Sequence, residues 1–197
     1  MTRLHRPIPI VFFLALLGAS AALTGCRTVW EDSYRPVVGA PPLPGTAAVV
    51  VREVPWERMD RAIEDSNARV AASDVHPSEW SDEEKIEARA ELLTSLQIAA
   101  DPAATRVLGV SSFRTTNRIR PWDGSLAAFA REVGANHVAW SDRYLGKAEA
   151  IVDRTVYIDS FGYGRRGFRS RRTTVTEPVV IKKDERGYTA FFLHIEP

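Results

Sequence analysis

The sequence predicts an α+β fold: a small antiparallel sheet with helices packed on one face, preceded by a helical segment. Three observations lead to this prediction. Helical periodicity dominates residues 56–98, strand patterns dominate residues 106–195, and the strands of the second segment are joined by short connections. Consecutive strands with short connections favour antiparallel pairing, with the helices as a separate layer.

The first 25 residues have the three parts of a secretory signal peptide. Arg3 and Arg6 come first, an uncharged apolar run follows over residues 7–23, and small residues end the segment. The run is too short and too rich in Gly and Ala for a membrane span of about 20 apolar residues. We therefore expect residues 1–25 to be removed and to form no part of the fold.

The apolar run ends in Leu23-Thr24-Gly25-Cys26, which resembles the lipobox of bacterial lipoproteins. This resemblance implies that a diacylglyceryl group alkylates the Cys26 thiol, that the chain is cut before this residue, and that the new amino group is acylated. Cys26 is the only cysteine, so an internal disulfide is excluded and the thiol is available for lipid. The alternatives are an ordinary signal peptide with a chance cysteine, or an uncleaved anchor.

Lipidation at Cys26 would fix where the protein resides. Burial of acyl chains contributes about 0.8 kcal/mol per methylene, so two or three chains form an effectively permanent anchor. Arg27 follows the cysteine in place of the Asp that resembles an inner-membrane retention signal. We therefore expect a protein anchored in the outer membrane that faces the periplasm, in a cell with two membranes.

The two halves of the remaining chain carry opposite charge. Residues 27–104 contain 8 Lys and Arg against 15 Asp and Glu, and residues 105–197 contain 16 against 10. The net charges are therefore −7 and +6. Residues 26–45 combine Cys26 with four prolines and few large apolar side chains, so they are predicted to be an extended tether between the lipid and the folded domain.

Residues 46–104 are predicted to form a strand and two helices with an acidic surface. The strand covers residues 47–54, and a helix begins near Trp56, just after Pro55. Apolar residues at helical spacing form its core-facing stripe: Trp56, Met59, Ile63 and Val70.

Ser81 and Glu84 match a capping box, which predicts a second helix from residue 81 to about residue 98, ended by Asp101-Pro102. Its acidic first turn suits the helix dipole. The side chains expected to be buried are Ile86, Ala90, Leu93 and Leu96.

Residues 105–197 are predicted to form strands around one helix. The helix covers residues 125–133 and is ended by Gly134. Strands are expected at residues 106–113, 136–141, 148–159, 173–182 and 188–195. Pro178 lies inside the fourth of these, which places that strand at an edge or a bulge.

This second half is similar to a domain of bacterial envelope lipoproteins of unknown activity. The likeness covers roughly the last 90 residues and includes a Gly- and Ser-rich stretch between the middle strands, here residues 160–170. The resemblance implies placement in the envelope and an α+β domain, and it implies no catalytic residues. The motifs that carry it are Gly109-Val110-Ser111-Ser112-Phe113, Val133-Gly134-Ala135-Asn136, Ser141-Asp142-Arg143-Tyr144-Leu145-Gly146 and Tyr188-Thr189-Ala190-Phe191-Phe192.

No catalytic centre, metal site or cofactor site is predicted. Ser111 and Ser112 lack the second glycine of a serine-hydrolase elbow, although His137 and Asp142 can be considered as triad partners. The histidines lack zinc-ligand spacing, and the acidic residues 82–87 lack the alternating pattern and the glycine of a calcium loop. An envelope hydrolase is therefore the weakest of the functional hypotheses.

Residues 160–172 are predicted to form a basic loop rich in Gly, Arg and aromatic residues, and this loop is the segment most suited to contact a ligand. Guanidinium groups bind phosphate and carboxylate in a bidentate manner, and aromatic rings stack on sugar or base faces. Nucleic acid is not expected in the periplasm, so the natural ligands are anionic lipid, lipopolysaccharide or anionic glycan. The alternative is a solvated hairpin tip that docks on the acidic half of the chain. The candidate residues are Arg165, Arg166, Arg169, Arg171 and Arg172, with Tyr163 and Phe168 among the interleaved aromatics.

Three functional hypotheses follow in order of preference. The first is a non-catalytic structural or interaction module of the envelope, bound to the membrane through its lipid. The second is a binder of an anionic envelope component through residues 160–172. The third is the hydrolase hypothesis.

Overall fold

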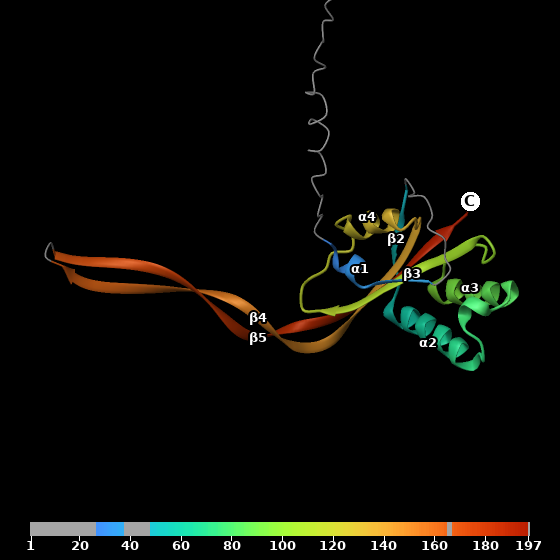
Figure 1. Ribbon diagram of the computed structural model, residues 1–197, viewed down its shortest axis with the longest axis horizontal. Helices are drawn as coiled ribbons and strands as arrows, with labels where there is room; N and C mark the ends of the chain where they lie inside the picture. The colour runs from blue at the N-terminus through green and yellow to red at the C-terminus, as the bar shows by residue number, and fades with distance from the viewer. Residues whose placement is uncertain (1–26, 38–47, 165–166, 197) are drawn as a thin grey trace, which may run out of the picture.

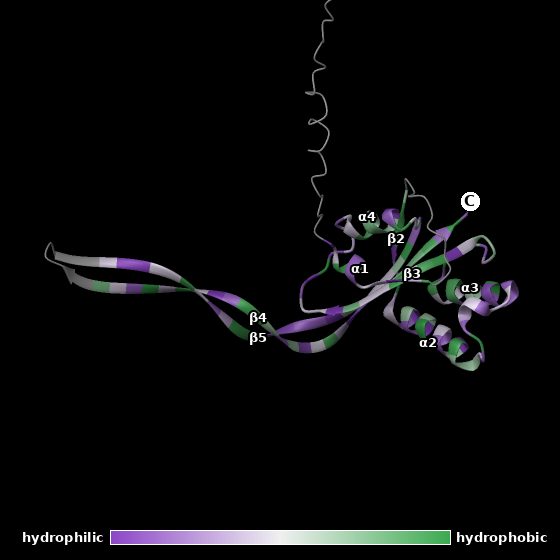
Figure 2. Cartoon of the chain, in the orientation of Figure 1, coloured by the Kyte–Doolittle hydropathy of each residue, from purple (hydrophilic) through white to green (hydrophobic). Residues whose placement is uncertain are grey.

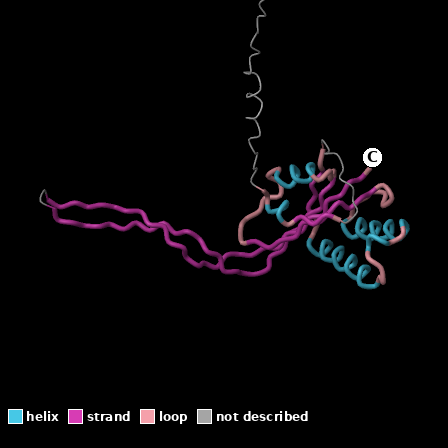
Figure 3. Tube along the Cα trace, in the orientation of Figure 1, coloured by secondary structure: helices cyan, strands magenta, loops and turns pink. Residues whose placement is uncertain are grey.

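The computed structural model describes residues 27–37, 48–164 and 167–196, and within them the chain has the predicted α+β fold (Figures 1 and 3). One five-stranded sheet has the strand order β1-β3-β5-β4-β2. The elements are α1 (Val29–Asp32), β1 (Tyr34–Pro36), β2 (Val50–Glu53), α2 (Trp56–Ala72), the 3-10 turn η1 (Pro77–Glu79), α3 (Asp82–Leu96), β3 (Thr105–Thr115), α4 (Ser125–Glu132), β4 (His137–Gly164) and β5 (Gly167–Ile195).

Helices cover both faces of the sheet, so the prediction that they pack on one face is wrong. The cause is the continuous apolar run in β4: Val138 and Trp140 belong to one core cluster, whereas Ala139 between them belongs to the other. Because successive side chains of a strand point to opposite faces, both faces are apolar and both must be covered. The sheet is also not wholly antiparallel, since β2 pairs with β4 in parallel.

The first face, here called face one, is covered by α1 and α4 (Figure 1). Leu126, Phe129 and Ala130 of α4 are buried against it, and the predicted Gly134 follows the helix with a positive φ of 80°. Tyr34 makes edge-to-face contacts with Phe129 and Phe192 in this core. Face one is therefore an aromatic core beneath two short helices.

Part of the predicted tether is folded into face one. Trp30 in α1 is only 1% exposed and lies in the core, and its carbonyl accepts a 2.7 Å hydrogen bond from the buried Ser111 hydroxyl. Immediately after α1, β1 pairs with β3 in antiparallel fashion. The prediction of a tether is therefore wrong for residues 29–36, because an aromatic side chain and an edge strand fix them to the sheet. Residues 38–45 lie outside the described residues.

The second face, here called face two, is covered by α2 and α3, as expected for the helical segment. Met59 and Leu93, both predicted as contacts with the sheet, are buried together with Phe191 of β5, and Ile63 packs at the margin of this cluster. The predicted capping box is also present, since Glu84 accepts a hydrogen bond from the Ser81 backbone N–H at 2.7 Å and Glu84 N donates to Ser81 Oγ at 3.2 Å.

β4 and β5 are continuous strands of 28 and 29 residues, whereas the sequence predicted four short strands in this region. The breaks expected near residues 142–147 and 183–187 are occupied by paired strand residues. A bulge between Tyr144 and Gly146, with Gly146 at a φ of 121°, replaces the first break. A bulge bends and twists a strand pair without ending it, so the hairpin continues away from the sheet.

Candidate functional site

The outer part of the β4–β5 hairpin projects from the body of the protein as a two-stranded ribbon (Figure 1). We define the ribbon as residues 146–164 and 167–185, which pair from Gly146 opposite Glu185 to Gly164 opposite Gly167. At about 3.3 Å per residue, each ribbon strand spans on the order of 60 Å. The ribbon is thus longer than a small domain is wide, and it carries its tip far from both cores.

Both long edges of the ribbon are open in the part of the chain that the structure describes. β3 pairs with β5 only as far as Arg186, and β2 pairs with β4 only over residues 137–140. Unpaired N–H and C=O groups along such edges can accept a further strand. A lone two-stranded hairpin is at best marginally stable in water. Among the described residues, the ribbon therefore lacks the neighbouring strands and helices that usually stabilise a hairpin.

Large apolar side chains are exposed along the ribbon, and Figure 2 shows that apolar and polar residues alternate along it. The register places Ile151 opposite Val180, and these two side chains are 74% and 60% exposed. On the other face, Val152 lies opposite Val179 and Val156 opposite Val175. Each face of the ribbon thus presents apolar cross-strand pairs that are separated by charged or polar pairs.

The arginine-rich segment lies at the outer end of the ribbon, but it is not the loop that the sequence predicted. Residues 160–164 and 167–172 belong to β4 and β5, so the expected loop of residues 160–172 is wrong in this respect. Direct pairing such as Ser160 with Arg171 and Phe161 with Ser170 extends the strands to the tip. Arg165 and Arg166 lie outside the described residues, as do the side chains of Tyr163, Phe168 and Arg169.

The two described arginines of the tip differ in their contacts. Arg172 Nε donates to Asp159 Oδ1 at 2.9 Å, and its guanidinium lies 5.8 Å from the centre of the Tyr157 ring. This hydrogen bond raises the pKa of Arg172. The exposed Arg171 accepts a hydrogen bond from Ser160 Oγ through its backbone carbonyl. Asp159 thus partly neutralises one of the five arginines that the sequence singles out.

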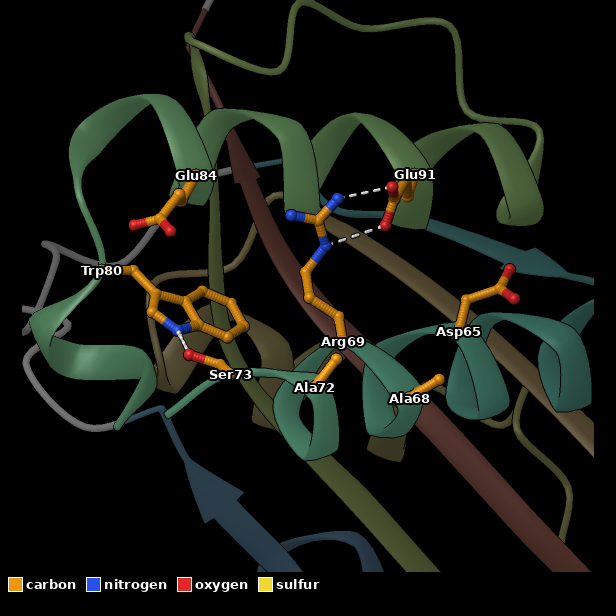
Figure 4. A pocket seen from close by; sticks show the side chains of 8 residues that line it. All are labelled: Asp65, Ala68, Arg69, Ala72, Ser73, Trp80, Glu84 and Glu91. Carbon is orange, nitrogen blue, oxygen red and sulfur yellow. Dashed lines mark hydrogen bonds and ion pairs between the residues drawn. The ribbon is translucent and has the colours of Figure 1, made fainter. Parts of the chain in front are cut away.

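A groove between α2 and α3 is a second candidate that the sequence did not suggest. It encloses a cavity of about 730 Å³, and Figure 4 shows Arg69 reaching from α2 across it to Glu91 on α3. Arg69 Nε donates to Glu91 Oε2 at 3.0 Å, and Glu87 lies 3.5 Å from the same guanidinium. The hydrogen bond between Arg69 and Glu91 raises the pKa of Arg69 and lowers the pKa of Glu91.

The groove continues into an adjoining cavity of about 660 Å³ above β3 and β5. The two cavities share Arg69 and Trp80, whose indole N–H donates to Ser73 Oγ at 2.9 Å. Phe191 and Leu92 supply apolar lining. Arg69, which both cavities share, is already paired with Glu87 and Glu91.

The residues considered for a hydrolase are engaged elsewhere. Ser111 donates to the Trp30 carbonyl, and the Ser112 hydroxyl lies 3.2 Å from that of Thr189. His137 Nδ1 lies 3.0 Å from Asn136 Oδ1, and Asp142 forms an ion pair with Arg186. The structure therefore does not assemble these residues into a serine, histidine and acid relay.

The histidines have local structural contacts. His76 caps the 3-10 turn η1 by accepting a hydrogen bond from Ser78 N, and His194 Nδ1 lies 3.0 Å from the Gly134 carbonyl. Burial lowers the pKa of His137. Among residues 27–37, 48–164 and 167–196, no group of three or more His, Cys, Asp or Glu side chains is arranged to hold a metal ion.

Comparison of the chain with protein-family models, with curated proteins and with solved structures found no match. None of the described helices is long and apolar enough to span a bilayer.

Proposed function

We propose that this protein is a non-catalytic interaction module of the bacterial cell envelope, anchored in the outer membrane through lipid on Cys26 and facing the periplasm. Its contacting element is the ribbon. One observation carries this proposal: the ribbon extends for 19 paired positions beyond the sheet with two open edges and exposed apolar side chains. Exposed apolar surface and free strand edges are features that proteins normally suppress unless they serve binding.

The partner that fits the ribbon best is another envelope protein that contributes a strand or an apolar surface. Strand addition supplies main-chain hydrogen bonds, and alternating side chains supply specificity. Exposed Ile151, Tyr157 and Val180 are available for such contacts. A partner would bury these side chains and pair an open edge, which would stabilise a hairpin that is marginal by itself.

A second candidate function rests on the charge of the tip. Five arginines lie within residues 165–172, and Arg171 is exposed. Such a tip suits anionic lipid, lipopolysaccharide or anionic glycan, because guanidinium groups pair with phosphate and carboxylate. In this case the ribbon would act as a spacer that carries the basic tip away from the acidic helices.

Site-specific photo-crosslinking in cells tests the first proposal. A photo-reactive amino acid placed at Ile151 should form adducts with an envelope protein, and one placed at Val70 should not. Val70 is the matched control: it was predicted on the core-facing stripe of α2, but it is 43% exposed, and it is apolar and lies outside the ribbon. Adducts at Val70 and not at Ile151 would assign the contact to the body and contradict the proposal.

The anchor is tested separately. Cys26→Ser should release the protein from the membrane fraction or leave it as a precursor, and intact mass analysis of the wild type should show an acylated chain that begins at residue 26. A mature chain that begins elsewhere and lacks lipid would exclude the anchor, whatever the ribbon binds.

Retention on anionic vesicles or lipopolysaccharide tests the second candidate. Replacing Arg165, Arg166, Arg169, Arg171 and Arg172 by serine should abolish retention, and added salt should weaken retention of the wild type because exposed charges are screened within about 8 Å. Phe168→Ala should weaken retention only if stacking contributes. Retention that salt does not change would argue against the arginines.

A further inference from the structure

We infer that the outer surface of the layer that covers face one, formed by α1, α4 and the connecting residues 116–124, lies directly against the bilayer that anchors the chain, with Trp122 at the level of the lipid headgroups. The inference rests on the proposed lipidation of Cys26. It adds an orientation and a membrane-contacting surface that the anchor alone does not specify.

The first argument is the distance from the anchor to the core. Cys26 is bonded to Arg27, the first described residue, and Trp30 is only 1% exposed in the core of face one. Four residues span at most about 14 Å when fully extended. Arg27 is further held to α1 by a 2.8 Å ion pair with Glu31. A lipid on Cys26 would therefore hold the body close to the bilayer and not at the end of a tether.

The second argument is Trp122, whose side chain is 69% exposed. Its ring lies edge-on to buried Trp140, with 5.1 Å between the ring centres and an angle of 64°. The exposed ring is thus held in place by the core and is not on a free loop tip. Tryptophan is favoured at bilayer interfaces because its ring is apolar and its indole N–H can bond to headgroups or water.

Trp122 and the anchor lie on the same side of the sheet. The connection that carries Trp122 packs on face one through Ile119, and α4 follows it directly. α1, which begins three residues after Cys26, contacts α4 on this side. Figure 1 shows α1 and α4 on one side of the sheet and α2 and α3 on the other.

The distribution of surface charge favours the same side of the protein for contact with the bilayer. Residues 56–96, which build the surface of face two, contain 11 acidic and five basic side chains, whereas residues 27–36 and 114–132 of the opposite layer together contain four acidic and six basic ones. Anionic headgroups would repel face two and attract exposed Arg118 and Arg120 beside Trp122. With face one on the bilayer, the acidic helices and the groove of Figure 4 point away from the membrane.

Quenching of tryptophan fluorescence by brominated lipid tests this orientation. The protein used is the chain from Cys26 onward, which contains every described residue. Cys26 is its only cysteine, so the Cys26 thiol can be coupled to a maleimide lipid. The vesicles contain phosphatidylethanolamine and phosphatidylglycerol with brominated acyl chains. Coupled wild-type protein should be quenched, and Trp122→Phe should remove most of that quenching. Trp80→Phe, which changes a tryptophan of the groove on the opposite side, should leave it in place.

Two results would overturn the inference: quenching that persists in Trp122→Phe, or quenching that is lost in Trp80→Phe. Circular dichroism of the variants would show that each is folded, which is expected for Trp122→Phe because the side chain is largely exposed. Chemical coupling separates this test from the proposed function. A failure of Cys26 acylation in cells would contradict the anchor and leave the measured orientation unchanged.

Discussion

The ring of Tyr34 lies directly against the α-carbon of Gly109. A β-carbon added to Gly109 would be 2.4 Å from Tyr34 Cε2, and the Tyr34 hydroxyl donates to the carbonyl of Leu108 at 2.9 Å. The edge strand β1 is therefore held on β3 by a ring that occupies the space of a missing side chain, in addition to the backbone pairing. The same ring makes edge-to-face contacts with Phe129 and Phe192.

Gly109→Ala is expected to destabilise the protein by displacing Tyr34. Overpacking of a core typically costs about 1–3 kcal/mol, and this range is the expected fall in the free energy of unfolding measured by urea denaturation. The matched control is Gly109→Ala in a Tyr34→Ala background, where the added methyl group has room. If Gly109→Ala lowered the free energy of unfolding equally in both backgrounds, the clash with the Tyr34 ring would not be the cause of the destabilisation.

Trp30→Ala is expected to destabilise the protein strongly because α1 is part of the core. Truncation of a buried tryptophan typically costs about 3–5 kcal/mol. The neighbouring Val29, 41% exposed, provides the control, since an exposed substitution such as Val29→Ala usually stays within about 0.5 kcal/mol. Equal stability of the two variants in thermal or urea unfolding would mean that residues 29–36 are a detached tether after all.

His137 is expected to make stability depend on pH. Burial lowers its pKa below the ordinary value of 6.5, so at acid pH the unfolded state binds more protons than the folded state. The contribution of neutral His137 is therefore fully present above pH 6.5 and is lost as pH falls from there through the folded pKa. The loss should be reduced in His137→Gln, as measured by urea unfolding between about pH 8 and pH 5. An NMR titration that placed the folded pKa above 6.5 would reverse the sign and refute this prediction.

The sequence correctly predicted the helix ends that are set by residues close in sequence. The capping box of Ser81 and Glu84 starts α3, and Gly134 follows α4 in a left-handed conformation; both are contained within a few residues of chain. Pro178 was expected at an edge, and it lies opposite Asp153 in the ribbon, where β5 has no second neighbour among the described residues.

Features that depend on distant contacts were not predictable in this way. Trp30 stands among charged residues and before several prolines, and only the closing of face one buries it. Charged residues interrupt the apolar pattern near Arg143 and Arg186, and a local pattern cannot tell whether exposed charges end a strand or line its solvent face. The groove depends on the pairing of Arg69 with Glu91, 22 residues apart.

The candidate site was identified in part. The arginines of residues 165–172 were recognised by composition, but their position at the end of a ribbon of 19 paired positions was not, because the sequence contains no signal for strand length. Trp122 carried no periodic signal at all. Its exposure and its contact with Trp140 both depend on the tertiary fold, which a local sequence pattern does not encode.

The last prediction separates the ribbon from the body. Ala150 and Ile181 are cross-strand partners an even number of pairs from Gly164 and Gly167, so they are a hydrogen-bonded pair, and residues 151–180 can be replaced by Asn-Gly, which favours the tight turn of a two-residue hairpin. The register of the remaining strands is then preserved. No residue between 150 and 181 belongs to either core cluster, so the free energy of unfolding should fall by far less than the roughly 2–5 kcal/mol typical of truncating one core side chain.

The shortened variant should keep its membrane anchor and its fold but lose both the crosslinks formed through the ribbon and any salt-sensitive retention through the arginines, because it lacks Ile151 and the whole tip. Urea unfolding and membrane fractionation check the first part, and the crosslinking and retention assays check the second. A large loss of stability would mean that the ribbon supports the body. Undiminished crosslinking of the shortened variant through a probe at Tyr144 would place the contact on the sheet. Tyr144 is suited to that probe because it is 54% exposed and lies on β4 just before the bulge from which the ribbon starts.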